Sequence, residues 1–248
     1  MKIGIIGVGH IGKTLALKLA QAGHDVVVAN SGGPENIDPA VLVTGARAVT
    51  AQQAVQGKEV IILSVPLNRI PELAPLFEAI SKETTVIDTS NYYPGRDRRI
   101  EIIEAGMVES LWVMQQLGRP ISKAWNAIGS HSLVVNGKPH GNPDRIAIPI
   151  AADRDIDREI TIRLVNDTGF DAFDTGSLAD SWRQQPGAPA YCTDLTLSEI
   201  QAVIDKAEKD RLPKRRDLVV AAIMERMSSA TANPDAEFGT RLSRAIYM

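Results

Sequence analysis

The stretch KIGIIGVGHIG, residues 2–12, decides the fold of this chain. Its first five residues are largely apolar and β-branched, which predicts a buried strand. The glycines that follow, Gly7, Gly9 and Gly12, have the spacing G-x-G-x-x-G. Apolar residues then recur at helical spacing over residues 10–22. A turn of this kind between a strand and a helix is the context in which the spacing indicates a dinucleotide site.

Each glycine has a separate physical reason to be there. Gly7 permits a tight turn, Gly9 lets the backbone approach a diphosphate, and Gly12 lets the helix pack close to the strand. The amide groups at the start of the helix, near His10 and Ile11, offer hydrogen bonds and the positive end of the helix dipole. We therefore expect these five residues to form a phosphate-binding site. The alternative is a strand–helix turn without a ligand.

Strands and helices alternate along the first half of the chain. We predict further strands at 25–29, 47–49, 59–63 and 84–88, and helices at 34–42, 51–56 and 69–80. Strands that alternate with helices pair in parallel, and strands that are apolar throughout belong to a sheet covered on both faces. The sequence thus predicts a doubly wound α/β (Rossmann) parallel sheet.

The second half is less regular. We predict strands at 121–125, 145–151 and 170–173, a long loop at 181–193, and helices at 111–117, 155–167, from Thr196 onward, 217–227 and, after an Asn233–Pro234 turn, 236–247. We divide the chain into an NADP-binding Rossmann domain, residues 1–152, and residues 153–248. The second part would complete the α/β layer and add a C-terminal helical extension, packed with the first as one unit.

Composition restricts the classes of function. A net charge of −3 over 248 residues gives no basic face for nucleic acid or a membrane surface, so we expect neither as a partner. The single cysteine, Cys192, cannot form an internal disulfide, and we interpret it as structural. His10 and Lys13 interrupt the apolar N-terminal segment, so we expect no signal peptide and a cytoplasmic location. The histidines lack the spacing of zinc ligands, so no metal site is predicted.

The end of the second strand bears on the choice of cofactor. NAD enzymes usually carry an acidic residue there, whereas Ala29 is followed here by Asn30, Ser31 and Gly32. These residues can donate hydrogen bonds to a 2′-phosphate, and no carboxylate among them repels it. We therefore predict NADP as the cofactor. Arg47 is either a further phosphate partner or a solvated surface residue.

Two more strand ends belong to the predicted pocket, because ligands of doubly wound sheets lie across the carboxyl ends of the strands. Ser64, Val65 and Pro66 end the fourth strand, and Asn91 follows the fifth. We expect them to contact the nicotinamide riboside. The alternative is ordinary loop chemistry, since serine, asparagine and proline are common in turns.

The order of these motifs resembles the coenzyme F420 (deazaflavin)-dependent NADP oxidoreductases and the related cytosolic domain of the six-transmembrane epithelial antigen metalloreductases. The resemblance covers about the first 130 residues, in the segments IIGVGHIG (5–12), ANSGG (29–33), ILSVP (62–66), VIDTSN (86–91) and KAWNAI (123–128). It implies hydride transfer between NADPH and a flavin-like, deazaflavin or other small acceptor. It also implies that Ser31 lies near the 2′-phosphate and that Ala124 and Asn126 lie beside the reactive ring. An arginine commonly follows the serine in that family, and Gly32 stands here.

Two other functions are open. In the first, the protein is an NADP-dependent dehydrogenase or imine reductase, in which Lys123 and Asn126 polarise a small carbonyl or imine. In the second, it is a non-catalytic NADPH-binding redox sensor. The catalytic residues are unknown from sequence. Polar and aromatic loop residues either hold a planar acceptor, fasten loops to the core or form a dimer contact: Tyr92, Tyr93, Arg96, Arg183, Gln184 and Tyr191. We expect a homodimer, because the apolar residues 218–220 and Ile223 suit a helical dimer face.

Overall fold

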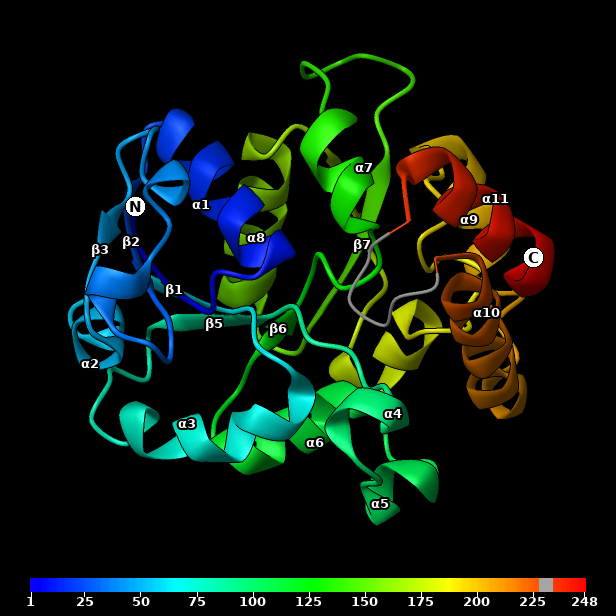
Figure 1. Cartoon of the computed structure of the whole chain (residues 1–248), viewed down its shortest axis with the longest axis horizontal. Helices are drawn as coiled ribbons and strands as arrows, with labels where there is room; N and C mark the ends of the chain where they lie inside the picture. Colours follow the sequence, from blue (N-terminus) through cyan, green and yellow to red (C-terminus); the bar gives the residue numbers. More distant parts are fainter. Residues whose placement is uncertain (228–233) are drawn as a thin grey trace.

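The computed structural model describes residues 1–227 and 234–248 of the chain (Figure 1). Its eight-stranded sheet has the order β3-β2-β1-β4-β5-β6-β7-β8. Strands β1 to β6 run parallel, β7 is antiparallel to β6, and β8 is parallel to β7. The order of the first six strands is that of a doubly wound dinucleotide-binding sheet, so the predicted fold class is confirmed. The strands are β1 Lys2–Ile6, β2 Asp25–Ala29, β3 Arg47–Ala48, β4 Val60–Leu63, β5 Thr85–Asp88, β6 Ser122–Lys123, β7 Ala147–Ala152 and β8 Asp171–Asp174.

Helices cover both faces of this sheet. Figure 1 shows α1 and α8 on one face, α3 and α6 on the other, and α9 to α11 at the opposite end of the molecule from β3. The α-helices are α1 His10–Gln21, α2 Ala51–Val55, α3 Ile70–Phe77, α4 Pro94–Asp97, α5 Glu101–Glu104, α6 Glu109–Leu117, α7 Ser130–Val135, α8 Asp155–Asp167, α9 Leu197–Ile204, α10 Leu212–Met227 and α11 Ala236–Tyr247. None of the described helices is long and apolar enough to span a bilayer.

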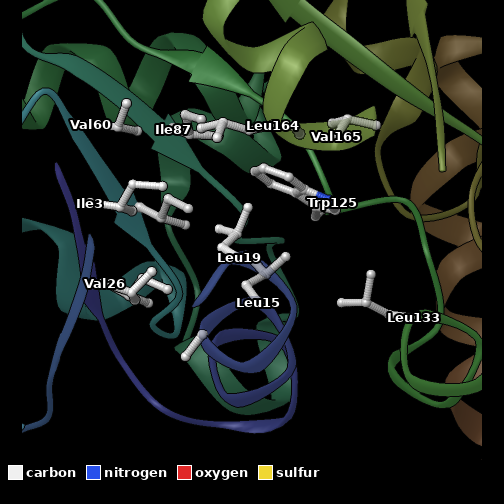
Figure 2. Close-up of a cluster of buried hydrophobic side chains, with 14 of the residues drawn as sticks. Ile3, Leu15, Leu19, Val26, Val60, Ile87, Trp125, Leu133, Leu164 and Val165 are labelled. Carbon is white, nitrogen blue, oxygen red and sulfur yellow. The ribbon is translucent and has the colours of Figure 1, made fainter. Parts of the chain in front are cut away.

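Two apolar layers hold the sheet between the helices. In one layer, Leu15 and Leu19 of α1 pack with Ile3, Trp125 and Leu164, and Figure 2 shows these side chains together. The second layer lies on the other face and contains side chains of α2, α3 and α6. Because both faces are buried, the strands need apolar residues at every position, which is the pattern seen in the sequence.

The predicted helix over 34–42 is wrong. Two single 3-10 turns, Pro34–Asn36 and Pro39–Val41, occupy this segment. The residue before a proline is driven out of the helical region, and Asp38 accordingly has φ −52° and ψ 121°. Its carboxylate instead accepts a hydrogen bond from the amide of Ala40, which begins the second turn.

The C-terminal helices are close to their predicted positions. The capping box at Thr196 begins α9, since the Glu199 carboxylate accepts a hydrogen bond from the Thr196 amide at 2.8 Å. Helix α10 begins at Leu212, earlier than expected, and Asn233 of the predicted turn lies outside the described residues. The short helices α4, α5 and α7 were not predicted. A small apolar cluster of Tyr191, Leu212, Val219 and Tyr247, among others, joins α10 and α11 to the loop before α9.

Candidate functional site

A cavity of about 380 Å³ lies where the carboxyl ends of β1, β4, β5 and β6 meet helices α7, α10 and α11. This is where ligands of doubly wound sheets bind, outside the carboxyl ends of the strands. Its volume falls within the range of about 300–1,000 Å³ that is usual for small-molecule sites. The predicted residues on its wall are Gly9, His10, Ile11, Ser64, Val65, Pro66, Asn91 and Asn126.

The three fingerprint glycines meet different surroundings. Gly7 has φ +98°, and a Cβ there would lie 2.2 Å from the carbonyl oxygen of Ser64. A Cβ on Gly12 would lie 2.0 Å from the carbonyl oxygen of Gly7. These two glycines are therefore required by the fold itself. A Cβ on Gly9 would meet no protein atom within 4 Å, so packing within the protein does not require a glycine there, and the space is open to a ligand.

The start of α1 has room and charge for a diphosphate. Gly9 is its N-cap residue, and the helix has no side-chain cap hydrogen bond and no acidic residue in its first turn. Such a helix end leaves amide groups and the positive end of the dipole free for an anion. Gly9, His10 and Ile11 all line the cavity, so this surface fits the diphosphate of a dinucleotide.

Three amide side chains are locked together at the ends of β5 and β6. The Asn126 side-chain nitrogen donates to the side-chain oxygen of Asn91 at 3.0 Å and to the Gln184 carbonyl at 2.8 Å. Gln184 returns a hydrogen bond to the Asn126 side-chain oxygen at 2.9 Å. The neighbouring hydroxyl of Ser90 is buried and has no hydrogen-bond partner within residues 1–227 and 234–248, and Ser90 lines the cavity. A buried polar atom of this kind indicates a missing ligand or water.

The comparisons with known proteins agree with this geometry. Residues 2–92 match the family model of NADP oxidoreductases, coenzyme F420-dependent. The match covers less than half of the chain, so it shows a similarity of this segment to that family. A curated relative, protein YjhV of Escherichia coli (strain K12), is 42% identical over 74 residues, which are 30% of this chain and 54% of YjhV. The match therefore spans about half the length of that relative.

Solved structures extend the likeness beyond residues 2–92. The hypothetical protein SMa0349 from Sinorhizobium meliloti has a TM-score of 0.66 and 26% identity, over 79% of this chain and 95% of that one. A provisionally assigned F420-dependent NADP reductase from Arthrobacter sp. FB24 has a TM-score of 0.57 and 14% identity, over 95% of this chain and 98% of that one. The latter likeness shows the fold alone, including the C-terminal helices.

In a doubly wound dinucleotide-binding sheet, the end of β2 is where the adenosine ribose would lie. The side-chain oxygen of Asn30 accepts a hydrogen bond from the Gly32 amide at 3.0 Å, so this amide is already used. Ser31 is exposed, and its hydroxyl remains the donor that the prediction requires. The carboxylate of Glu35 lies against Gly33, because a Cβ there would come within 2.5 Å of its oxygen. The negative charge of this carboxylate repels a phosphate at the same turn.

Arg47 lies away from the end of β2 in this structure, which favours the alternative of a solvated surface residue. Its guanidinium donates to Asp25 at 2.7 Å, and Asp25 begins β2, whereas Ser31 follows its end. The parallel pairing of Arg47 with Val27 places Arg47 beside the middle of β2, with its side chain turned toward the amino end. The register of a two-residue strand was not visible in the sequence.

Lys123 does not reach the cavity either. Its side chain is fully buried, and its ammonium group donates to Asp88 at 2.6 Å and to the Ser90 carbonyl at 2.5 Å. The role of polarising a substrate is therefore wrong for Lys123, although Asn126 does line the cavity. Lys123 instead fixes the turn after β5. Ala124 is buried in the apolar layer beside α1 and is not among the residues that line the cavity.

The substrate side of the cavity combines three residues that the sequence singled out with helices that it did not assign to the site. Of the six polar and aromatic loop residues, Tyr93, Arg96 and Tyr191 line the cavity, together with parts of α7, α10 and α11. Burial raises the pKa of the Cys192 thiol, so the thiol stays protonated, which agrees with a structural role. The sequence did not indicate that α7, α10 and α11 line the cavity, because their apolar residues match ordinary core patterns.

Proposed function

We propose that this protein is an NADP(H)-dependent oxidoreductase that transfers hydride between the nicotinamide and a small acceptor held in the cavity. The observation that carries the proposal is the open space above Gly9, at a helix start that faces the ends of β4, β5 and β6. The similarity of residues 2–92 to the coenzyme F420-dependent NADP oxidoreductases supports the same chemistry. When bound, reduced nicotinamide supplies a hydride.

The residues of the chain position and shield this reaction. Gly9, His10 and Ile11 would hold the diphosphate, and Ser31 the 2′-phosphate. Val65 and Pro66 would border the nicotinamide riboside, and the locked pair Asn91–Asn126 would border the ring. Because these amides are fixed by their mutual hydrogen bonds, they hold one orientation without reorganisation. The acceptor lies between them and the helices α10 and α11.

The test is a binding titration followed by an acceptor screen. We expect NADPH to bind more tightly than NADH in calorimetry. We expect NADPH oxidation with at least one acceptor among FMN, FAD, a deazaflavin, ferric chelates, small ketones and cyclic imines. No binding of either nucleotide would refute the proposal. Binding without turnover of any acceptor would favour the redox-sensor function instead.

A homodimer belongs to the same proposal. Helix α10 exposes Leu218 and Met224, which are 49% and 50% accessible. Large apolar side chains at such exposure suit a protein contact. Light scattering on the full chain measures the mass in solution, and a monomeric mass at all concentrations would exclude this part of the proposal.

A further inference from the structure

Two tyrosine hydroxyls lie side by side on the cavity wall. The hydroxyl of Tyr93, in the turn after β5, lies 2.7 Å from that of Tyr191, in the loop before α9. Both residues line the cavity. They are separated by 98 residues in the chain and meet only in the fold. We call them the tyrosine pair.

One of the two phenol protons of the tyrosine pair has no acceptor in the hydrogen bond between the two hydroxyls. Each phenol has one proton, and only one of the two is needed for the hydrogen bond between them. The side-chain nitrogen of Asn91 also donates to the Tyr191 hydroxyl, at 3.1 Å. Its orientation is fixed, because the Asn91 side-chain oxygen accepts from Asn126. In the part of the chain that the structure describes, neither hydroxyl donates to any further acceptor, so the second proton is available to a ligand.

The surroundings keep both hydroxyls neutral and directed. Burial is the main cause, and the neighbouring Tyr93 the second, of the rise in the pKa of Tyr191 well above its usual value. The phenol is therefore protonated and a donor at physiological pH. The guanidinium of Arg96 lies 5.3 Å from the ring centroid of Tyr93 and donates to the Asn91 carbonyl at 2.6 Å. The same guanidinium forms an ion pair with the buried Asp97 carboxylate at 2.7 Å, so it contributes mainly by fixing Asn91 and the ring of Tyr93 rather than as a free charge.

The loop that carries Tyr191 is held in a strained conformation. Cys192 and Asp194 have φ of 53° and 48°, a region that residues with a side chain seldom adopt. The Asp194 carboxylate accepts from Ser132 at 2.6 Å, and Arg244 of α11 donates to the Thr193 carbonyl at 2.7 Å. Strained backbone conformations that are held by surrounding contacts occur most often at functional sites. We therefore interpret the position of Tyr191 as a functional feature.

We propose that the tyrosine pair donates a hydrogen bond and then a proton to the carbonyl oxygen or imine nitrogen of the hydride acceptor, which makes the acceptor a small carbonyl or imine compound. This inference rests on the proposed function. The acceptor π bond breaks as its carbon gains a hydride from reduced nicotinamide. Its electron pair moves to the oxygen or nitrogen, which takes the tyrosine proton. Water returns a proton to the pair, so one hydride and one proton are consumed.

Binding of an unreactive probe tests the donor without any turnover. The probe is 2-pyrrolidinone, whose amide carbonyl accepts a hydrogen bond but is not readily reduced by hydride. We expect Tyr191→Phe and Tyr93→Phe to weaken its binding to the full chain by up to about tenfold, as loss of one hydrogen bond predicts. The matched control is Tyr92→Phe, because the Tyr92 hydroxyl accepts from the Ile100 amide outside the cavity. NMR titration measures each affinity.

Turnover gives the second measurement. With a small ketone or a cyclic imine, we expect kcat to fall about a hundredfold or more in Tyr191→Phe, as for other lost charge-stabilising donors, while the NADPH affinity stays unchanged. We expect a solvent deuterium isotope effect with these acceptors. Any one of three results would overturn the inference. The first is equal turnover rates in wild type and both variants, and the second is no binding of 2-pyrrolidinone to wild type. The third is a loss of kcat with FMN as large as the loss with the ketone or imine. NADPH binding that persists in those cases leaves the proposed function standing, and its absence refutes that function itself.

Discussion

The substitution Gly9→Val distinguishes an effect on NADPH binding from an effect on the stability of the fold. The backbone at Gly9 has φ −67° and ψ −167°, an extended conformation open to every residue type. A Cβ there meets no protein atom within 4 Å, so the valine side chain points into the space assigned to the diphosphate. Two amide hydrogen bonds to a charged diphosphate contribute about 3–6 kcal/mol. At about 1.4 kcal/mol per factor of ten, we expect the NADPH affinity to fall at least about a hundredfold.

The same variant should leave stability nearly unchanged. Glycine loses more chain entropy on folding than other residues, so valine gains about 0.4–1 kcal/mol, partly offset because valine is a poor N-cap residue. The control is Gly12→Ala, whose Cβ would lie 2.0 Å from the Gly7 carbonyl oxygen. We expect this control to lose about 1–3 kcal/mol of unfolding free energy or more.

Calorimetric titration with NADPH and thermal unfolding measure the two quantities on each variant. Our reasoning predicts a loss of affinity at constant stability for Gly9→Val, and a loss of stability for Gly12→Ala. Wild-type NADPH affinity in Gly9→Val would show that the diphosphate lies elsewhere. A fall in melting temperature equal to that of Gly12→Ala would show that Gly9, too, is required by the fold.

Three further predictions test other parts of the structure. Ser31→Asp should lower the NADPH/NADH affinity ratio about tenfold or more by charge repulsion, and an unchanged ratio in fluorescence titration would remove Ser31 from the phosphate site. Lys123→Met should lower the unfolding free energy, measured in urea, by about 3–5 kcal/mol, because it leaves the Asp88 carboxylate buried and unpaired. Adding Asp88→Asn should restore most of this free energy, and no recovery in the double variant would contradict the ion-pair explanation. Burial raises the pKa of Glu109 from 4.5 to about 7, so the folded state binds this proton more tightly, and the unfolding free energy should fall by about 3 kcal/mol as the pH rises from about 4.5 to 7. Glu109→Gln should abolish that fall, and parallel pH profiles of wild type and variant would show that another group causes it.

The Rossmann half could be predicted because its signals are local. A strand, three glycines and a helix follow one another within residues 2–22, and each later strand is a short apolar run bounded by polar turns. Ser64, Asn91 and Asn126 follow strand ends, and parallel strands bring their carboxyl ends to one edge. Their convergence on one cavity is therefore a consequence of the pattern of strands and helices alone.

The positions of Arg47 and Lys123, outside the predicted pocket, share a tertiary cause. Arg47 follows Ser31 in the sequence, but the register of β3 turns it toward the opposite end of the sheet, where Asp25 takes its guanidinium. Lys123 stands at the end of β6, yet its side chain is buried against Asp88 and away from the cavity. Neither a register nor the partner of a buried charge is encoded in local spacing, so both residues looked like binding residues.

The position of Tyr191 shows how the two halves of the chain depend on each other. Trp125, Cys192 and Asp194 have positive φ without being glycine, and each costs about 1–3 kcal/mol. Their sum is comparable to the whole stability of a typical domain, so contacts elsewhere must offset it. Arg244 of α11 supplies two of them, to the carbonyls of Thr193 and Asp194, at 2.7 and 3.1 Å. The C-terminal helix thus holds Tyr191 beside Asn91 of the Rossmann half, and a cavity lined by both the amide side chains and the tyrosine pair exists only when both halves are folded together.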